Sequence, residues 1–322
     1  MITQTWKVKF WNQAVNLYVI AGKDGLIFDS GGGGKVQADY LSDQIHAIKN
    51  LMHERGVDFN PARVLLSHGH YDHFSGMSFL RDTFGVKLWV TQQMVASITS
   101  EKEYRKKYQL SKDNFKDRSL SIKLIKGMKN SLEGLFYMKL LTCDAKFVKG
   151  PFEIINENSE ITINGETWEI IPIPGHSPDH LAIYNPQSGV LLAGDLLFKS
   201  VDTFLGPPES DLDAYLNSLQ TIYDLPNLKL ILSAHGNPID NPHKRIRSTI
   251  EHRRSQVEKV LNSVKASGAK GISFRQIVKL LYPERRDRPF LASAEVKVIL
   301  AYLQNKEQLH QKIIGNRIVY TL

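Results

Sequence analysis

Cysteine is almost absent from this chain, since Cys143 is the only one among 322 residues. A single cysteine excludes an intramolecular disulfide, and with it the class of small secreted proteins that disulfides stabilise. A lone cysteine more often packs as an inert side chain than acts as a nucleophile. The sequence therefore predicts a protein of a reducing compartment, the cytoplasm.

Long hydrophobic runs are also missing. No apolar stretch approaches the roughly 18 residues that a membrane-spanning helix needs. The first ten residues carry two lysines and two aromatics without a continuous apolar segment, so we expect no secretory signal peptide. A composition of 42% hydrophobic and 23% charged residues over 322 positions is typical of a soluble protein of about two domains, with no membrane partner.

The positive charge is unevenly distributed along the chain. The net charge is +8, yet residues 101–129 carry +6 and residues 243–322 carry +11, which leaves −9 for the remainder. Two basic segments therefore flank an acidic body. This pattern indicates either an anionic substrate or partner, or merely two solvated helix faces, and the sequence leaves both open.

Apolar runs that end in polar loops recur through the first 240 residues. A hairpin is expected from residues 17–20 to 25–28, and helices over 40–55 and 74–84. Further strands are expected at 64–67, 87–91, 161–163, 168–173, 181–184, 190–193 and 228–233. Strands and helices without a strict βαβ rhythm favour two sheets with helices outside, which is an α/β (α+β) fold of the αββα sandwich type.

Residues 97–150 interrupt this rhythm. They are rich in Lys, Ser, Tyr and Met, with helical stretches and no clear strand. An insertion of this length inside a compact domain usually covers a site or forms an interface. We interpret it as a helical lid within a catalytic domain of residues 1–240.

Residues 241–322 have a pattern of their own. Asn241 and Pro242 are the expected N-cap and first position of a helix over 243–266. Helices over 273–282 and 291–308 follow, and then a hairpin over 311–320. This order predicts a winged-helix-like C-terminal domain. It could bind nucleic acid, with Arg285, Arg286 and Arg288 as candidate contacts, form a homodimer contact, or line the active-site cleft.

Four potential metal ligands lie close together near the start of the chain. His68, His70, Asp72 and His73 directly follow the apolar run 64–66. A loop that leaves a strand can turn all four inward, whereas a helix would spread these offsets around its circumference. Imidazoles and carboxylates suit zinc, iron or manganese, so the sequence predicts a metal site rather than a histidine-rich surface turn.

Three more candidate ligands, His176, Asp195 and His235, each follow an apolar strand. All seven can therefore meet along one edge of the sandwich. Seven ligands are too many for one tetrahedral ion and suit two ions that share a carboxylate. A hydroxide that bridges two divalent ions can attack at neutral pH without a protein nucleophile. Asp72 has the charge and the position to orient or deprotonate that water as well as to bind metal, so we assign it a catalytic role.

The motifs that carry these residues resemble the metallo-β-lactamase superfamily. They are the His-x-His-x-Asp-His string, the Pro-Gly-His string at 174–176, the Gly-Asp pair at 194–195 and the Ala-His-Gly string at 234–236, in consistent order over residues 15–240. The resemblance implies a first ion on His68, His70 and His176, a second on Asp72, His73 and His235, and Asp195 as the bridge. Zinc is the expected metal, with manganese or iron as alternatives.

The same resemblance implies supporting residues and a subgroup. Asp29 matches an early Asp-x-Gly turn that supports the ligands from behind, and His180 could either support them or face substrate. The chain is similar to lactamase-β-like hydrolases with a C-terminal winged-helix domain, which include endoribonucleases and thioesterase-like enzymes. The longer 97–150 insertion departs from that subgroup.

Two functions follow from these patterns. The favoured one is a dinuclear metal-dependent hydrolase of a small anionic ester or thioester, such as an acyl-carrier thioester, because a lid suits a small molecule. Cleavage of glutathione thioesters is less favoured, because the basic tail does not resemble a glutathione-binding segment. The alternative is a metal-dependent endoribonuclease or phosphodiesterase, which the basic segments fit. Iron-based redox chemistry is disfavoured by His70 and by the lack of a flavin fingerprint. A metal-free regulator is disfavoured because no ligand is missing.

Overall fold

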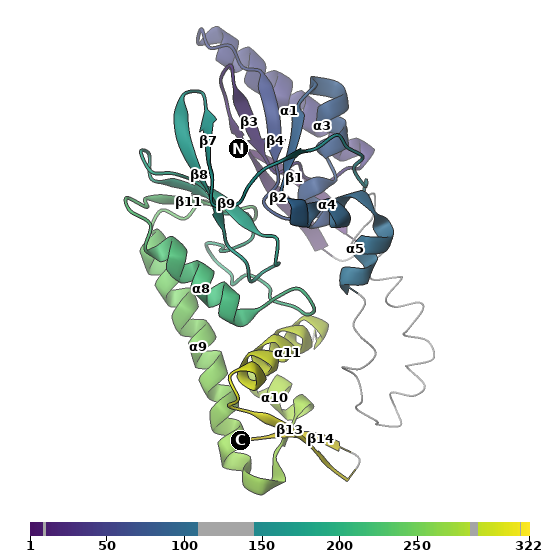
Figure 1. The fold of residues 1–322 in the computed structure, drawn as a ribbon, viewed down its shortest axis with the longest axis vertical. Helices are drawn as coiled ribbons and strands as arrows, with labels where there is room; N and C mark the ends of the chain where they lie inside the picture. Colours follow the sequence, from purple (N-terminus) through teal and green to yellow (C-terminus); the bar gives the residue numbers. More distant parts are fainter. Residues whose placement is uncertain (9–10, 109–144, 284–288, 316) are drawn as a thin grey trace.

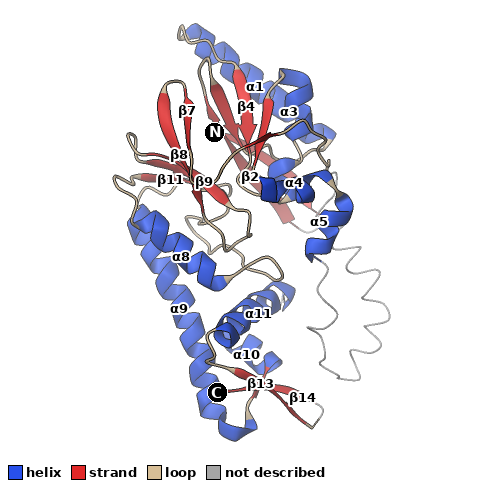
Figure 2. Ribbon diagram, in the orientation of Figure 1, coloured by secondary structure: helices blue, strands red, loops and turns tan. Residues whose placement is uncertain are grey.

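The computed structural model describes the chain except for residues 9–10, 109–144, 284–288 and 316 (Figure 1). Two large β-sheets face each other, with helices on their outer faces, and a smaller C-terminal part lies below them in this view (Figure 2). The mixed α/β sandwich expected from the sequence is therefore confirmed. Among the described residues, no helix combines the length and apolar character that crossing a membrane requires.

The first sheet contains six strands in sequence order: β1 (Ile2–Val8), β2 (Trp11–Ile20), β3 (Gly25–Phe28), β4 (Pro61–Leu65), β5 (Lys87–Val90) and β6 (Glu153–Ile154). The first three are antiparallel, and β3 to β6 run parallel. Helices α1 (Lys35–Glu54) and α3 (Met77–Phe84) lie beside this sheet (Figure 1). Because parallel strands share one carboxyl end, the loops that follow β3 and β4 emerge together.

The second sheet contains five strands in the order β11-β10-β9-β8-β7. Their bounds are β7 Glu160–Ile163, β8 Glu166–Pro172, β9 Leu181–Asn185, β10 Val190–Leu192 and β11 Leu230–Leu232. Every residue of β9 is buried. Leu181 and Ile183 join the core between the two sheets, while Ala182 and Tyr184 join the core under the outer helices. Alternate side chains of a strand point to opposite faces, so this sheet is covered on both sides.

Helix α8 (Leu212–Tyr223) packs under the outer face of the second sheet, and α9 (Pro242–Ser267) runs beside α8 into the C-terminal part (Figure 1). Helix α9 starts as the sequence predicts, because the Asn241 side chain accepts a hydrogen bond from the Lys244 amide and Pro242 stands in the first turn. Asp211 caps α8 in the same way through the Ala214 amide.

The C-terminal part follows the predicted order of elements. It comprises α9, a 3-10 turn (Gly268–Lys270), β12 (Ile272–Ser273), α10 (Phe274–Leu281), α11 (Pro289–Asn305), β13 (His310–Ile314) and β14 (Arg317–Thr321). The three strands form a small sheet in the order β12-β14-β13. One continuous apolar cluster joins this part to α8 and the second sheet. The division at residue 240 and the winged-helix assignment stay predictions.

Some element boundaries differ from the expectations. The helix expected over 74–84 begins at Met77, as α3. A separate short helix, α2 (Tyr71–Phe74), precedes it and carries Asp72 and His73, which were expected on a loop. Helix α2 does not continue into α3, because the Gly76 amide donates to the Gly31 carbonyl at 3.0 Å instead of to the preceding turn. Helix α1 begins at Lys35 rather than at residue 40. Of the expected lid, α5 (Glu101–Tyr108) is helical and follows α4 (Gln92–Thr99), while residues 109–144, with Cys143, lie outside the described residues.

Candidate metal centre

The seven residues singled out in the sequence all lie at one edge of the sandwich. They come from the segments that follow four strands, β4, β8, β10 and β11, of both sheets. The structure gathers them into two groups of potential ligand atoms, which are His68, His70, His176 and Asp195 in one group and Asp72, His73 and His235 in the other. Within each group the ligand atoms lie within 4.8 Å of one another.

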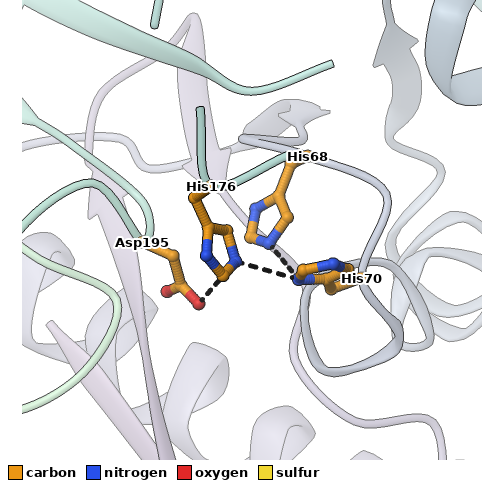
Figure 3. A group of neighbouring side chains, drawn as sticks. All are labelled: His68, His70, His176 and Asp195. Atoms are coloured by element: carbon orange, nitrogen blue, oxygen red, sulfur yellow. Dashed lines mark hydrogen bonds and ion pairs between the residues drawn. The ribbon is translucent and has the colours of Figure 1, made fainter. Parts of the chain in front are cut away.

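The first group consists of three imidazoles and one carboxylate that point toward a common centre (Figure 3). The Nδ1 atom of His70 lies 2.7 Å from Nε2 of His68 and 3.1 Å from Nε2 of His176. Asp195 Oδ2 lies 3.5 Å from Nε2 of His176. His70 thus presents a different ring nitrogen to the centre from the other two histidines.

The second group lies beside the first and shares a neighbour with it. Nε2 of His73 and Nε2 of His235 lie 3.9 Å and 3.6 Å from the carboxylate oxygens of Asp72. The other carboxylate oxygen of Asp195, Oδ1, lies 3.6 Å from His73 Nε2 and 3.3 Å from His235 Nε2. Asp195 therefore stands between the two groups, with one oxygen directed at each.

In the first group, the ring nitrogens that face away from the common centre lie beside hydrogen-bond acceptors. These contacts fix the tautomer of each histidine. His176 Nδ1 lies 3.0 Å from the Phe204 carbonyl, and His70 Nε2 lies 3.2 Å from Glu209 Oε2, so both must donate. The Ser67 hydroxyl donates to Asp29 and therefore accepts from His68 Nδ1, 2.9 Å away. The inward nitrogens of these imidazoles then carry lone pairs.

The second group is held from behind in the same manner. Asp29 Oδ2 lies 2.9 Å from His73 Nδ1, and Asp29 Oδ1 accepts from the Ser67 amide at 2.7 Å. His235 Nδ1 donates to the carbonyl of Ala14 in β2. Asp29 adopts a φ of 65°, a conformation uncommon outside glycine but tolerated by aspartate. The supporting role that the resemblance implied for Asp29 agrees with these contacts.

Gly194, just before Asp195, permits the close approach of the two sheets at this point. Its φ is +49°, and a Cβ there would lie 2.6 Å from His180 Nε2 and 2.7 Å from the Ser67 side chain. Its neighbour Asp195 donates its backbone N–H to His180 Nε2 at 3.1 Å. His180 is 1% exposed, so it supports the Asp195 loop and does not face substrate.

The electrostatics of the first group favour neutral imidazoles. Burial lowers the pKa of His68 well below its usual value, and the neighbouring histidines add to this. Burial, with the field of His70, lowers the pKa of His176 to about 4. Neutral imidazole is the form that binds metal, so this group is ready to accept a cation at neutral pH.

The second group has the opposite tendency. Burial alone would lower the pKa of His73, but Asp29, Asp195 and Asp72 outweigh it and raise that pKa well above its usual value. Against the same effect of burial, Asp195 and Asp72 raise the pKa of His235 to about 9. In turn, His235 and His73 overcome burial and hold the pKa of Asp195 well below its usual range. Without a metal ion, protons supply the positive charge that these carboxylates require.

The residues fit divalent cations. Three lone pairs of the first group face one another at 2.7–3.1 Å, an arrangement that a cation would relieve. In the described part of the chain, the buried atoms His73 Nε2 and Asp195 Oδ1 have no hydrogen-bond partner, and both are directed into the site. Buried polar atoms are rarely left unsatisfied, so they mark a place for another ligand. Imidazole and carboxylate are donors that zinc, iron and manganese accept.

Several residues that shape this site were not found in the sequence. Glu209 contacts His70, and the Phe204 carbonyl contacts His176; both belong to the segment between β10 and α8. Asp179 accepts from the Gly69 amide at 3.2 Å and from the Ser177 hydroxyl at 2.8 Å, which links two ligand loops. Asp179 stands within the Pro-Gly-His string and could have been noticed there, whereas a carbonyl leaves no sequence signal.

The family model of the metallo-beta-lactamase superfamily matches residues 11–235, which is more than half of the chain. A beta-lactamase-like protein 2 homolog of Caenorhabditis elegans is 30% identical over 114 residues, 35% of this chain and only 37% of that relative. The hydroxyacylglutathione hydrolase GloC of Haemophilus influenzae is 26% identical over 216 residues, 66% of this chain and 81% of that relative.

Two further similarities extend over more of the chain. An atrochrysone carboxyl ACP thioesterase of Passalora fulva is 27% identical over 281 residues, 85% of this chain and 65% of that relative. The crystal structure of a beta-lactamase domain protein from Burkholderia ambifaria is similar in fold, with a TM-score of 0.75 at 20% identity, covering 99% of this chain and 90% of the other. The chain therefore belongs to the metallo-β-lactamase superfamily and is a metal-dependent hydrolase.

Proposed function

We propose that this protein hydrolyses a small anionic ester or thioester with the help of two divalent metal ions, expected to be zinc. The first ion would be held by His68, His70 and His176, the second by Asp72, His73 and His235, and Asp195 would bridge them. The observation that carries the proposal is the position of Asp195, whose two carboxylate oxygens lie 3.3–3.6 Å from histidines of both groups.

Two divalent ions, when bound, supply a hydroxide nucleophile at neutral pH and neutralise the charge that develops on the acyl oxygen. We assign proton transfer during hydrolysis to Asp72. Asp72, 6% exposed, would accept the proton that a water loses as it becomes this hydroxide, and would return it to the departing thiolate. The acyl carbon then gains oxygen as its bond to sulfur breaks. Ser67 is fully buried and its hydroxyl donates to Asp29, so it does not compete as a nucleophile.

An acyl thioester is favoured by the relatives. The names hydroxyacylglutathione hydrolase and ACP thioesterase both describe hydrolysis of an acyl thioester, and the second match extends over 85% of this chain. The two basic segments of the sequence suit an anionic carrier group on the leaving thiol. This supports the class of substrate and leaves the acyl chain open.

The nucleic-acid alternative is weakened by the packing of α11. In a winged helix the third helix reads nucleic acid through an exposed face. Here α11 contacts α8, α9 and α10, and its buried residues are spread around the helix: Ala292, Ala294, Glu295, Val296, Val298, Ile299, Leu300 and Leu303. Among the described residues of this helix, only part of the surface is left to offer a groove. Arg285, Arg286 and Arg288 lie outside the described residues.

The test is a parallel assay of one preparation on three substrate classes. Metal-free protein reloaded with zinc, manganese or ferrous iron is given acyl thioesters of pantetheine and glutathione, a lactone, and single-stranded RNA. We expect metal-dependent hydrolysis of a thioester and intact RNA. Cleavage of RNA without thioester hydrolysis would instead support a phosphodiesterase.

A pair of variants tests the role of Asp72. Asp72→Asn should lower kcat at least 100-fold, the usual range for a lost acid or base. Asp82→Asn, an exposed carboxylate on α3 paired with Arg81, is the matched control and should leave turnover unchanged. Wild-type kcat in Asp72→Asn would remove Asp72 from the reaction.

A further inference from the structure

The segment of residues 198–204, which we call the site loop, touches both groups of ligands. The ring of Phe198, at one end, packs against the His235 ring with 5.4 Å between centroids. The carbonyl of Phe204, at the other end, accepts the hydrogen bond from His176 Nδ1 at 3.0 Å. The position of this loop therefore influences the orientation of the His235 and His176 rings.

Helix α9 holds the site loop through an arginine. Arg245 donates from Nε to the Phe198 carbonyl at 2.6 Å and from Nη2 to the Val201 carbonyl at 2.7 Å. The same Nη2 lies 2.9 Å from Asp202 Oδ1, and the Asp202 carboxylate also contacts His252 on α9. One guanidinium thus joins three points of a loop that has no secondary structure of its own.

A second arginine of α9 reaches the other end of the loop. Arg253 is 2% exposed and donates from Nη2 to the carbonyl of Thr203, the residue before Phe204. Its Nη1 bonds to Gln256 Oε1 at 3.1 Å and lies 3.8 Å from Glu295 on α11. A buried charge of this kind is stable only when it is paired and hydrogen-bonded. The C-terminal helices therefore fix the backbone next to the carbonyl that orients His176.

We propose that Arg245 and Arg253 are positioning residues of the metal centre. Helix α9, which follows all seven ligands in the sequence, then helps to set the geometry of the site. This inference rests on the proposed function. Groups that orient a ligand histidine usually change metal affinity 10- to 100-fold when removed. Lysine cannot replace arginine here, because one ammonium on a flexible stem does not span several carbonyls in a fixed plane.

The experiment compares three Arg→Lys variants of the full chain. Arg245→Lys and Arg253→Lys remove the contacts to the site loop. Arg247→Lys is the matched control, because Arg247 lies on the same helix and bonds to Tyr223 of α8. For each metal-free protein, zinc affinity and stoichiometry are measured by competition with a chromophoric chelator, and cobalt(II) absorption spectra report ligand geometry.

We expect at least tenfold weaker binding of one ion and an altered cobalt spectrum in Arg245→Lys and Arg253→Lys, with Arg247→Lys like wild type. Circular dichroism and thermal unfolding of the metal-free variants identify any that does not fold. Arg245 is part-exposed, so Arg245→Lys keeps the test decisive if Arg253→Lys does not fold. Wild-type affinity and spectrum in folded Arg245→Lys would overturn the inference. Wild-type protein that binds no zinc would overturn the proposed function itself, and the inference with it.

Discussion

Replacing Asp195 with asparagine tests the shared carboxylate most directly. The amide has nearly the same size, so the packing around this residue, which is 7% exposed, should change little. What the substitution removes is one negative charge between two groups of ligands. The three nitrogens that surround it lie 3.3–3.6 Å from its oxygens.

The size of the effect follows from these distances. At an effective dielectric constant of about 20, opposite unit charges roughly 3.5 Å apart attract by about 5 kcal/mol. A cation held between these groups loses an attraction of this order when the charge disappears. Each 1.4 kcal/mol corresponds to a factor of ten in affinity, so even about 3 kcal/mol gives more than a hundredfold weaker binding.

Metal content is the appropriate assay. We expect Asp195→Asn, dialysed against buffered zinc, to retain one ion or fewer per chain and to have no measurable turnover. Asp82→Asn, an exposed carboxylate paired with Arg81, is the control and should bind as wild type. If Asp195→Asn holds two ions with wild-type affinity, Asp195 does not bridge them and the two-ion interpretation of the geometry is wrong.

Two further predictions concern the remaining ligands. Glu209→Ala should weaken zinc binding about 10- to 100-fold, because it removes the acceptor of His70 Nε2. Chelator competition would measure this against Glu153→Ala, an exposed control, and unchanged affinity in Glu209→Ala would contradict it. In metal-free protein, the raised pKa of His235 gives stability that is present below pH 6.5 and lost as the pH rises through about 9. The lowered pKa of His176 costs stability as the pH falls from 6.5 toward about 4. The melting temperature of the metal-free protein should therefore peak near pH 6.5. A melting temperature that rises steadily up to pH 9 would disprove this.

The convergence of the seven candidate ligands could be predicted from the sequence because their local setting repeats. His68, His176, Asp195 and His235 each follow a short apolar run that contains part of a strand in the structure. Strand ends of stacked sheets meet at one edge, so the convergence of distant residues follows from topology. The structure brings the same seven residues together and places Asp195 with the first group, whereas its role as a bridge and the ligand assignment stay predictions.

The parts that could not be predicted depend on backbone rather than on side-chain type. The carbonyls of Phe204 and Ala14 fix two of the histidines, and any residue could supply them. The break between α2 and α3 coincides with the hydrogen bond from the Gly76 amide to the carbonyl of Gly31, which is remote in sequence. Helix α8 is a different case, since its buried residues Leu212, Tyr215, Leu219 and Ile222 have helical spacing and were simply missed.

The orientation of the ligands is a property of the whole fold. The outer nitrogens of His235, His73, His176 and His70 are held by Ala14, Asp29, Phe204 and Glu209, which belong to β2, the turn after β3 and the segment after β10. Each partner accepts a hydrogen bond, which makes the inward nitrogen a stronger donor to a metal. In the first group the lone pairs consequently face one another although this crowding is unfavourable, and packing elsewhere must offset the cost. The site loop, residues 198–204, is held by hydrogen bonds from α9 and not by the ligand loops themselves. A protein with the same seven ligands but without these hydrogen bonds would therefore keep the donor atoms and lose their orientation.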